Sequence, residues 1–375
     1  MSLSLNISDG VIDSGVVSDP SAQVGAALVR QAGKLNNVQV LRFVAAAFVA
    51  LYHSWYYLGV FVGKPPILDV LNGQWGFYGV TIFFAISGFL MSDLLQTTDC
   101  WTFILHRVVR IYPLYYLALL ALLPWQAGYD AIGLMLVPAG PHPGPLGIEW
   151  TLVYETAFYV LLFIVSLIGL ARHVAAAASV WLAAILVTTW SAPEWQNTVA
   201  LPVQTFLLSS MNVGFAAGLL LPTLMKRAIL WPLFVIIGIP LILLSLRADL
   251  HTMRWMGGLS VALAVGTAAQ LPQLKGENIV STTFIKLGDW SYATYLVHPC
   301  ILWTIYQAKE YSHPLRIWAL SLVAIAAVTL VLGPLDIRLY RFLRGRVNRL
   351  TRPTTICIAL GYLGVFTIGC IAGAV

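Results

Sequence analysis

Charged residues are scarce in this chain. Asp, Glu, Lys and Arg make up 10% of its 375 residues, whereas 59% of the residues are hydrophobic. A soluble domain carries about 25% charged residues, so this shortage excludes an ordinary soluble enzyme and a second water-soluble domain of any size. The formal net charge of +6 does not indicate nucleic acid as a partner, because the basic residues follow the loop pattern described below. We therefore expect a polytopic membrane protein.

Cysteine is also rare, with four residues in the chain. Cys100, Cys300, Cys357 and Cys370 lie far apart, and the sequence has neither a CxxC pair nor the Cys/His spacing of a metal site. Three of them fall in apolar segments, where a free cysteine behaves as a small hydrophobic residue. The sequence thus predicts no disulfide framework and no bound metal.

Two further features are missing, an internal repeat and a signal peptide. Without a repeat, nothing indicates the paired halves of an inverted-repeat transporter. Residues 1–37 are polar and lack the basic start and apolar core of a signal peptide. We expect this stretch to be a disordered cytoplasmic tail.

Apolar segments near the ~20 residues that span a bilayer make up most of the remaining chain. The sequence predicts an all-α polytopic integral membrane protein with a membrane domain over 38–353 and an extra C-terminal transmembrane helix over 354–375. The third candidate segment is short unless it continues the helix before it. The eleven candidates lie near 39–61, 77–95, 111–125, 151–171, 174–191, 201–225, 229–246, 255–272, 287–307, 315–335 and 355–375.

Lysine and arginine set the expected orientation. If the N-terminus is cytoplasmic, sixteen of these residues fall on the cytoplasmic side and five on the outer side, which is the bias of the positive-inside rule. We therefore expect a multi-pass protein with a cytoplasmic N-terminus. The outer five are Lys64, Arg247, Arg254, Lys309 and Arg316.

Two stretches do not fit a simple span. CWTFILHRVVRIYP begins at Cys100 and alternates apolar and basic positions at helical spacing, which predicts an amphipathic helix on the cytoplasmic surface. VPAGPHPGPLGIEW begins at Val137 and is dense in Pro and Gly, which predicts an ordered outer loop or a re-entrant turn.

The first apolar segment carries two ionisable residues, which are costly in a membrane and are candidates for function by default. Arg42 lies near one end of the segment, and His53 follows about 16 Å further along a helix on nearly the same face. This topology puts His53 past mid-membrane toward the outside, and the face between the two residues carries small side chains. The alternative is a histidine that a polar neighbour satisfies and that serves only helix packing.

Glu155 is the candidate partner of His53. It lies in WTLVYETAFY, at the start of the fourth span and one to two turns in from the outer face, so it can reach the depth of His53. A carboxylate that orients an imidazole makes a general-base pair. The alternative is an ion pair or hydrogen bond that only holds two helices together.

Arg107 and Arg110 are three residues apart on one helix face. Together with Arg42 they predict a cytoplasmic cluster that can hold phosphate groups. The alternative is that these residues bind lipid headgroups and set the topology.

Four further residues are candidates for lining a cavity near these groups. Ser87 in the second span is also a candidate nucleophile, although Ser-Gly within a span usually marks close helix contact. Trp150 lies near the outer face, where an aromatic ring can stack on a sugar but is common in any membrane protein. Tyr295 and His298 lie in LGDWSYATYLVHP, and a structural role for His298 is equally compatible with the Pro that follows it.

Taken together, these stretches resemble the integral-membrane acyltransferase family 3, which includes O-antigen, exopolysaccharide and Nod-factor acetylases. They run from about Leu41 to Pro299, and the intervening spans fit the ten-helix core of the family. Thr151 replaces the usual Ser, and Arg344 stands where the family commonly has Glu. In chain order the matching stretches are Arg42 with His53, GVTIFFAISGFL, FILHRVVRIYPLYY, EWTLVYETAFY and GDWSYATYLVHP.

The resemblance implies a membrane-bound O-acyltransferase of the bacterial inner membrane. Such an enzyme transfers an acyl group, usually acetyl from cytoplasmic acetyl-CoA, to a glycan hydroxyl at or beyond the outer face. Acyl-CoA is then a donor substrate and not a bound cofactor. The other implied partners are a glycan or lipid-linked oligosaccharide acceptor, membrane lipids and the envelope polysaccharide machinery. The resemblance puts the essential Arg and His of the family on Arg42 and His53, its basic pair on Arg107 and Arg110, and its WSLxxE glutamate on Glu155.

These observations lead to one mechanistic hypothesis and two rivals. Arg107, Arg110 and Arg42 hold the nucleotide phosphates, the pantetheine arm follows the small-residue face of the first span, and His53 acts as general base. In this hypothesis Glu155 holds the tautomer of His53, and a covalent acyl-histidine relay is an open variant. The rivals are a multi-pass transporter of a glycan or acylated metabolite and a non-enzymatic scaffold.

Overall fold

The computed structural model describes residues 35–123, 130–140, 144, 146–196, 198–307 and 313–373. Within these ranges the chain is helical and forms no β-strand beyond one isolated bridge, between Ala139 and Pro202. The predicted tail over 1–37 lies almost wholly outside the described residues. From Leu35 onward, the described residues form one unit.

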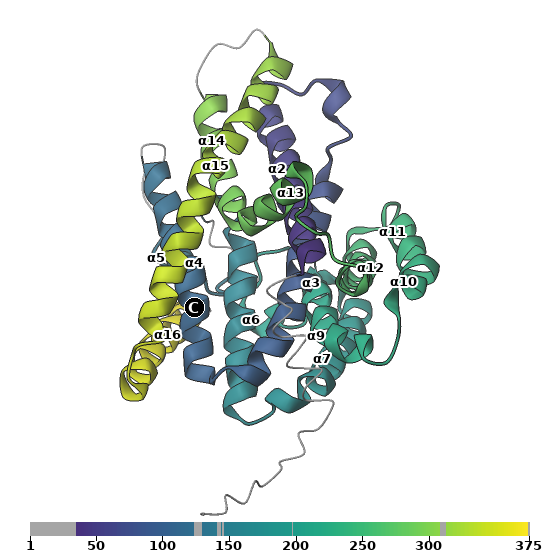
Figure 1. The fold of residues 1–375 in the computed structure, drawn as a ribbon. Helices are drawn as coiled ribbons and strands as arrows, with labels where there is room; N and C mark the ends of the chain where they lie inside the picture. Colours follow the sequence, from purple (N-terminus) through teal and green to yellow (C-terminus); the bar gives the residue numbers. More distant parts are fainter. Residues whose placement is uncertain are drawn as a thin grey trace, which may run out of the picture. The chain divides into compact units, whose positions relative to one another are not determined.

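Long apolar helices dominate this unit (Figure 1), and the predicted all-α polytopic membrane protein is confirmed. Seven helical segments in the described part are long and apolar enough to cross a bilayer. They contain α2 (Asn36–Phe61), α3 (Gly73–Thr97), α4 (Cys100–Leu122), α6 (Glu149–Leu167), α7 (Val174–Ser191), α15 (Pro314–Val347) and α16 (Arg352–Ala372).

The other predicted spans are helices that are shorter, interrupted or less apolar. A π-helical turn, Phe234–Gly238, joins α10 and α11, because Pro240 removes a donor from the regular ladder. The remaining helices are α5 (Ala131–Met135), α8 (Val203–Phe206), α9 (Val213–Met225), α10 (Leu230–Leu233), α11 (Ile239–Ser245), α12 (Leu250–Gln270), α13 (Ile279–Asp289) and α14 (Ser291–Gln307).

Side-chain caps fix where several helices begin. The Asn72 side chain accepts a hydrogen bond from the backbone N–H of Gln74 at the start of α3, over 3.0 Å. Asp99 does the same for Thr102 at the start of α4, over 3.1 Å. Such caps satisfy donors that have no partner within the helix and contribute about 1 kcal/mol each.

α3 crosses α9 at a glycine in each helix, Gly88 in α3 and Gly218 in α9. A Cβ atom at Gly88 would meet the carbonyl oxygen of Phe215, and one at Gly218 would meet the carbonyl oxygen of Ala85. Small residues let the two backbones approach closely. This crossing fixes the height of α3 and therefore of Ser87, which precedes Gly88.

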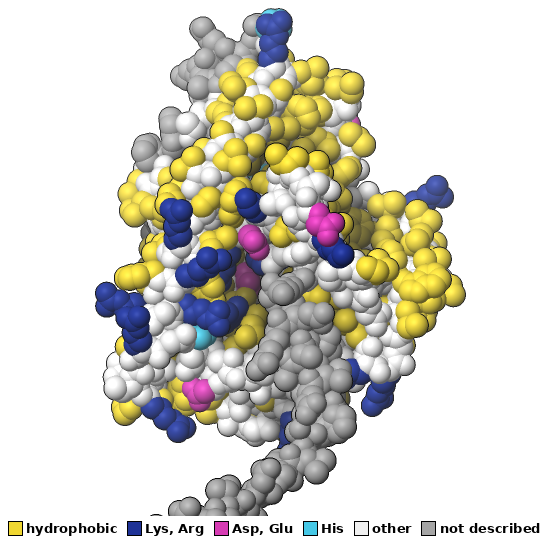
Figure 2. Space-filling model, viewed as in Figure 1, with side chains coloured by type: hydrophobic (Ala, Val, Ile, Leu, Met, Phe, Trp, Pro, Cys, Tyr) yellow, Lys and Arg dark blue, Asp and Glu magenta, His cyan; other side chains and the backbone are white. Residues whose placement is uncertain are grey.

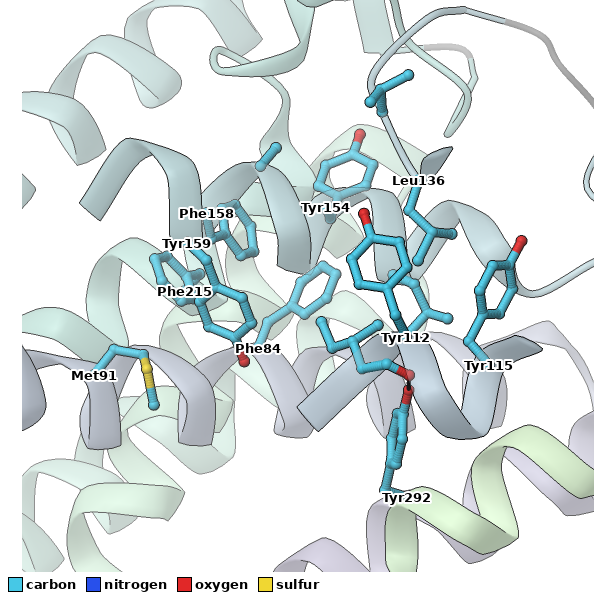
Figure 3. Packing of buried hydrophobic residues seen from close by; sticks show 14 of the residues in the cluster. Phe84, Met91, Tyr112, Tyr115, Leu136, Tyr154, Phe158, Tyr159, Phe215 and Tyr292 are labelled. Atoms are coloured by element: carbon cyan, nitrogen blue, oxygen red, sulfur yellow. Dashed lines mark hydrogen bonds between the residues drawn. The ribbon is translucent and has the colours of Figure 1, made fainter. Parts of the chain in front are cut away.

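An aromatic cluster holds α6 against α9. The rings of Phe158 and Phe215 stack with centroids 3.9 Å apart and planes 13° apart, and Tyr154 and Phe84 lie around them (Figure 3). Aromatic pairs of this kind add about 0.5–1.5 kcal/mol beyond the area that they bury. The cluster leaves the opposite face of α6 free to line cavities.

The stretch CWTFILHRVVRIYP is helical, as its pattern predicts, and its place at the cytoplasmic surface stays a prediction. It is the first half of one continuous helix, α4, which runs through Pro113. Phe103 and Ile104 are buried in the main core. The basic positions Arg107 and Arg110 face an internal cavity.

The C-terminal helix α16 packs against α4 and α5. The ring of Tyr362 meets that of Tyr112 edge-on with centroids 5.8 Å apart. Ala359 and Phe366 belong to the same hydrophobic core as α4 and α6. The predicted extra helix over 354–375 thus shares its packing with the membrane domain.

Candidate active site

An internal cavity of about 240 Å³ collects most of the predicted charged residues. Six helices contribute to its wall, so residues that are distant in sequence meet there. Its polar lining consists of Arg42 from α2, Ser87 from α3, Arg107 and Arg110 from α4, Thr151, Glu155 and Tyr159 from α6, Tyr292 and Tyr295 from α14, and Tyr340 from α15.

Arg110 is held in place by a buried ion pair. Its Nη1 lies 2.8 Å from Oδ2 of Asp336 in α15. The guanidinium carbon lies 4.6 Å from the ring centroid of Tyr292 and 5.3 Å from that of Tyr340. Asp336 was not predicted, although an acidic residue directly after the apolar segment near 315–335 is a signal of the kind that singled out His53.

Arg107 keeps unused donors. One terminal nitrogen donates to the hydroxyl of Tyr340 over 3.4 Å, and the other lies 3.9 Å from the sulfur of Met91. Its Nε has no hydrogen-bond partner among the described residues. A guanidinium offers five N–H donors in a planar fork, so Arg107 can bind an anion in the cavity.

Arg42 and Glu155 complete the charged end of the cavity. Arg42 interacts electrostatically with Asp289 and Glu155. The hydroxyl of Tyr159 donates to the carboxylate of Glu155. Glu155 thus lies with the arginines and helps to balance their charge.

Asp289 ends α13 beside this group. Arg42, Arg341 and Arg110 interact electrostatically with its carboxylate. Arg42 thus has two acidic neighbours, Asp289 and Glu155.

His53 lies beyond this cavity, next to His298. Nδ1 of His53 is 3.1 Å from Nε2 of His298 and 3.0 Å from the carbonyl oxygen of Val49. Nδ1 of His298, which is fully buried, is 3.3 Å from the carbonyl oxygen of Thr294. The two rings lie with centroids 5.0 Å apart.

This geometry assigns the tautomers of both rings. A carbonyl oxygen can only accept a hydrogen bond, so in the neutral rings each Nδ1 carries the proton. His53 then donates from Nδ1 to Val49 and to Nε2 of His298. The lone pair on Nε2 of His53 is left free, as a general base or nucleophile requires.

The predicted pairing of His53 with Glu155 is therefore replaced by a pairing with His298. The cause is the depth at which α6 begins. Leu146 and Ile148, which lie just before α6, and Glu149, its first residue, are buried, so the helix starts inside the protein. Glu155 follows the start by about 9 Å and reaches the arginines instead of His53.

The small-residue face of α2 does not form the predicted path for a donor. A Cβ atom at Gly79 would meet the carbonyl oxygen of Ala45 and would lie 2.7 Å from Cγ2 of Val49. This face is packed against α3. The apolar wall of the cavity comes instead from Val80, Phe83 and Leu152.

Tyr295 connects the cavity to the histidine pair. It lines the cavity, and its ring meets that of His298 edge-on with centroids 5.8 Å apart. Its hydroxyl bonds with the side chain of Thr151 and donates to the carbonyl oxygen of Ile148 over 3.2 Å. One aromatic ring therefore separates the inner end of the cavity from the imidazoles.

The structure places the other predicted site residues as follows. Ser87 lies in the cavity wall, and its hydroxyl has no hydrogen-bond partner in the described ranges. Trp150 lines a second cavity, together with Glu149. Glu149 was not singled out from the sequence, although it is an ionisable residue at the start of an apolar segment. Within the described ranges, no group of three or more His, Cys, Asp or Glu side chains is arranged to hold a metal ion.

A helical membrane protein with an arginine-lined cavity beside a pair of histidines has the parts of a membrane-embedded group-transfer enzyme. The comparisons identify the group. The family model described as an acyltransferase domain matches residues 35–335. The chain thus belongs to the integral-membrane acyltransferase family 3 and is a membrane acyltransferase.

One curated relative extends this result. The chain is 25% identical over 337 residues to Nodulation protein 10 of Rhizobium leguminosarum bv. viciae, which covers 75% of this chain and 87% of the relative. No solved structure matches the chain.

Proposed function

We propose that the protein transfers an acyl group, most simply acetyl, from cytoplasmic acyl-CoA to a hydroxyl of a cell-surface or exported glycan. One observation carries the proposal. A single cavity is lined by Arg42 and Arg107 and also by Tyr295, whose ring meets that of His298. The proposed phosphate site and the proposed base are thus separated by one aromatic ring.

The arginine end of the cavity suits the phosphates of the donor. Arg107 and Arg42 offer donors, whereas Arg110 is neutralised by Asp336 and orients the wall. The cavity volume of about 240 Å³ is below the range of about 300–1,000 Å³ for drug-sized ligands. It is therefore too small for a whole acyl-CoA molecule, and we place in it only the acyl group and the adjoining end of the pantetheine arm, with the nucleotide at the mouth.

The surface around this end has matching charge. Lys and Arg side chains gather about a hollow on one face, and hydrophobic side chains cover the region above it (Figure 2). The end of α15 carries Arg338, Arg341, Arg344 and Arg346, and Arg349 follows it. This distribution supports a cytoplasmic position for this end of α15 and for the N-terminus, in a bacterial inner membrane.

In the proposed reaction, Nε2 of His53 takes the proton of the acceptor hydroxyl while the oxygen attacks the thioester carbonyl. The C–O bond forms, the C–S bond breaks, and the thiolate of CoA leaves with the proton from His53. His298 accepts the Nδ1 hydrogen of His53 and so keeps Nε2 free. A relay through an acyl group on Nε2 would use the same lone pair.

The proposal is tested with purified protein, radiolabelled acetyl-CoA and polysaccharide isolated from a deletion strain. We expect labelled O-acetyl groups on the polysaccharide with the wild type and a loss of about 10²–10⁴ in rate with His53→Ala. Unlabelled polysaccharide with the wild type, or full activity in His53→Ala, would overturn it. The glycan-modifying machinery of the envelope is the expected cellular context.

A further inference from the structure

The first turns of α6 form a wall between two cavities. Thr151 and Glu155 line the inner cavity with the arginines. Glu149, Trp150 and Val153 line a second cavity of about 260 Å³. The other walls of this outer cavity come from α5, from the loops that follow it, and from the segment before α8. A two-substrate enzyme needs two such compartments, and the proposed donor occupies the inner one.

Glu149 brings an unsatisfied carboxylate oxygen to the outer cavity. The residue is 4% exposed, and its Oε1 accepts a hydrogen bond from the backbone N–H of Leu146. Its Oε2 makes no hydrogen bond of normal geometry in the part of the chain that the structure describes, although the backbone N–H groups of Gly147, Ile148 and Glu149 interact with the carboxylate. A buried polar atom without a partner is costly, so this oxygen indicates a ligand that donates a hydrogen bond.

Glycine keeps the space next to this oxygen open. A Cβ atom at Gly144 would lie 2.6 Å from Oε2 of Glu149, and both residues line the cavity. A side chain at position 144 would therefore cover the carboxylate. Because Gly144 has no side chain, a ligand can approach the carboxylate of Glu149.

The outer cavity also approaches the reacting histidine. Gly147 lies in its wall with φ at +73°, a conformation that favours glycine. A Cβ atom there would lie 2.8 Å from the hydroxyl of Tyr57, whose ring stacks on that of His53 with centroids 5.8 Å apart. The wall of the outer cavity is thus one aromatic ring away from His53.

The lining of the outer cavity defines what it can bind. Among its described residues, Glu149 is the single carboxylate, and there is no Lys or Arg. The indole of Trp150 adds a flat apolar surface. An aromatic face beside a hydrogen-bond acceptor suits a polyhydroxylated ring, whereas a carboxylate on the ligand would be repelled without a compensating cation.

We propose that the outer cavity is the acceptor subsite, where an uncharged sugar residue donates a hydroxyl hydrogen bond to Oε2 of Glu149 and lies against Trp150. The inference rests on the proposed function, because it takes acyl transfer to a glycan as given. The volume of about 260 Å³ is below that of pockets for drug-sized ligands, so it holds one sugar and the rest of the glycan lies outside. Sugars that carry a carboxylate are excluded.

The test compares two acceptors with the purified full-length protein and acetyl-CoA. The acceptors are the methyl glycoside of a neutral hexose and that of the corresponding uronic acid. For the wild type we expect a kcat/KM at least about 10-fold higher with the hexoside, since one charged contact of this kind changes affinity by at least that factor.

Glu149→Gln isolates the carboxylate, because the amide oxygen can still accept from Leu146. We expect the KM for the hexoside to rise about 10-fold, the preference over the uronoside to shrink, and the KM for acetyl-CoA to stay within about twofold. Trp150→Leu should also raise the acceptor KM alone. Glu277→Gln, at a side chain that is 73% exposed, is the matched control and should change neither KM.

The outcomes separate the two claims. A wild type that acetylates neither glycoside would overturn the proposed function and this inference with it. A wild type that is active, with Glu149→Gln and Trp150→Leu both leaving the acceptor KM unchanged, would overturn the acceptor subsite alone. Equal use of the hexoside and the uronoside by the wild type would also overturn the acceptor subsite. The same holds if Glu149→Gln and Trp150→Leu raise the KM for acetyl-CoA and leave the acceptor KM unchanged.

Discussion

His53 donates its Nδ1 hydrogen to Nε2 of His298 across 3.1 Å. The two residues come from α2 and α14 and are far apart in sequence. Because His298 bonds through its own Nδ1 to the carbonyl oxygen of Thr294, it offers His53 an acceptor and no competing donor. His298 is a positioning residue for the nitrogen that reacts.

The first prediction separates this role of His298 from simple packing. His298→Gln keeps a carbonyl oxygen that can accept from His53, whereas His298→Leu removes the acceptor. We expect kcat to fall about 10-fold in His298→Gln and about 100-fold or more in His298→Leu, since general-base catalysis contributes about 10²–10⁴. Steady-state kinetics with acetyl-CoA measures this, and the donor KM should not change.

His313→Gln is the control for that series, because His313 is exposed at the start of α15. It should retain wild-type rates. Equal losses in His298→Gln and His298→Leu would indicate that His298 serves packing alone.

The second prediction concerns the donor phosphates. Arg107→Ala should raise the KM for acetyl-CoA about 10- to 100-fold, because hydrogen bonds to charged groups contribute about 1.5–3 kcal/mol. Arg107→Lys should recover part of this loss, since an ammonium keeps the charge but not the planar fork. Initial rates over a range of acetyl-CoA concentrations give the values. Arg172→Ala, outside the cavity lining, should leave the donor KM unchanged, and a matching rise there would contradict a specific phosphate site.

The third prediction concerns the buried pair of Arg110 and Asp336. Removing one partner leaves a buried charge unpaired, so Asp336→Asn should destabilise the protein by about 3–5 kcal/mol. The double variant Asp336→Asn with Arg110→Gln should recover most of that loss. Thermal unfolding in detergent measures both.

The exposed pair of Lys275 and Glu277 is the control, with the two groups 3.7 Å apart and both largely in water. Breaking it with Glu277→Gln should cost less than about 1 kcal/mol. If the single Asp336→Asn variant were as stable as the wild type, the pair would not hold Arg110 in place.

The fourth prediction concerns the crossing of α3 and α9. Gly88→Ala brings a Cβ atom against the backbone of Phe215, so it should lower stability by about 1–3 kcal/mol through overpacking. Gly364→Ala in α16 meets open space and should instead be neutral or stabilise by up to about 1 kcal/mol through helix propensity. A comparison of unfolding temperatures decides, and effects of the same sign at both sites would contradict the close crossing.

Much of this site follows from spacing along single helices. Arg107 and Arg110 face the same cavity because they are three residues apart on one helix. Arg42 and His53 lie about 16 Å apart along α2. Hydropathy likewise predicts the helical membrane fold. These features depend on the geometry within a single helix, so they can be predicted from one segment of the sequence.

The errors all concern the depth and the rotation of helices relative to one another. Glu155 meets the arginines because α6 starts inside the protein, behind the buried residues Leu146 and Ile148. The sequence of α6 alone does not show where the helix starts relative to its neighbours. The small face of α2 packs on α3 because Gly79 allows it. Both outcomes depend on tertiary packing, which overrides the pattern within a segment.

The most direct test of the account uses purified protein in proteoliposomes, with radiolabelled acetyl-CoA on one side of the membrane and the hexoside on the other. The account predicts labelled hexoside when acetyl-CoA is supplied on the side of the arginine end, and none when it is supplied only on the opposite side. It also predicts loss of labelling in His53→Ala. Movement of unmodified hexoside across the membrane without any labelling, or labelling that His53→Ala leaves intact, would contradict it.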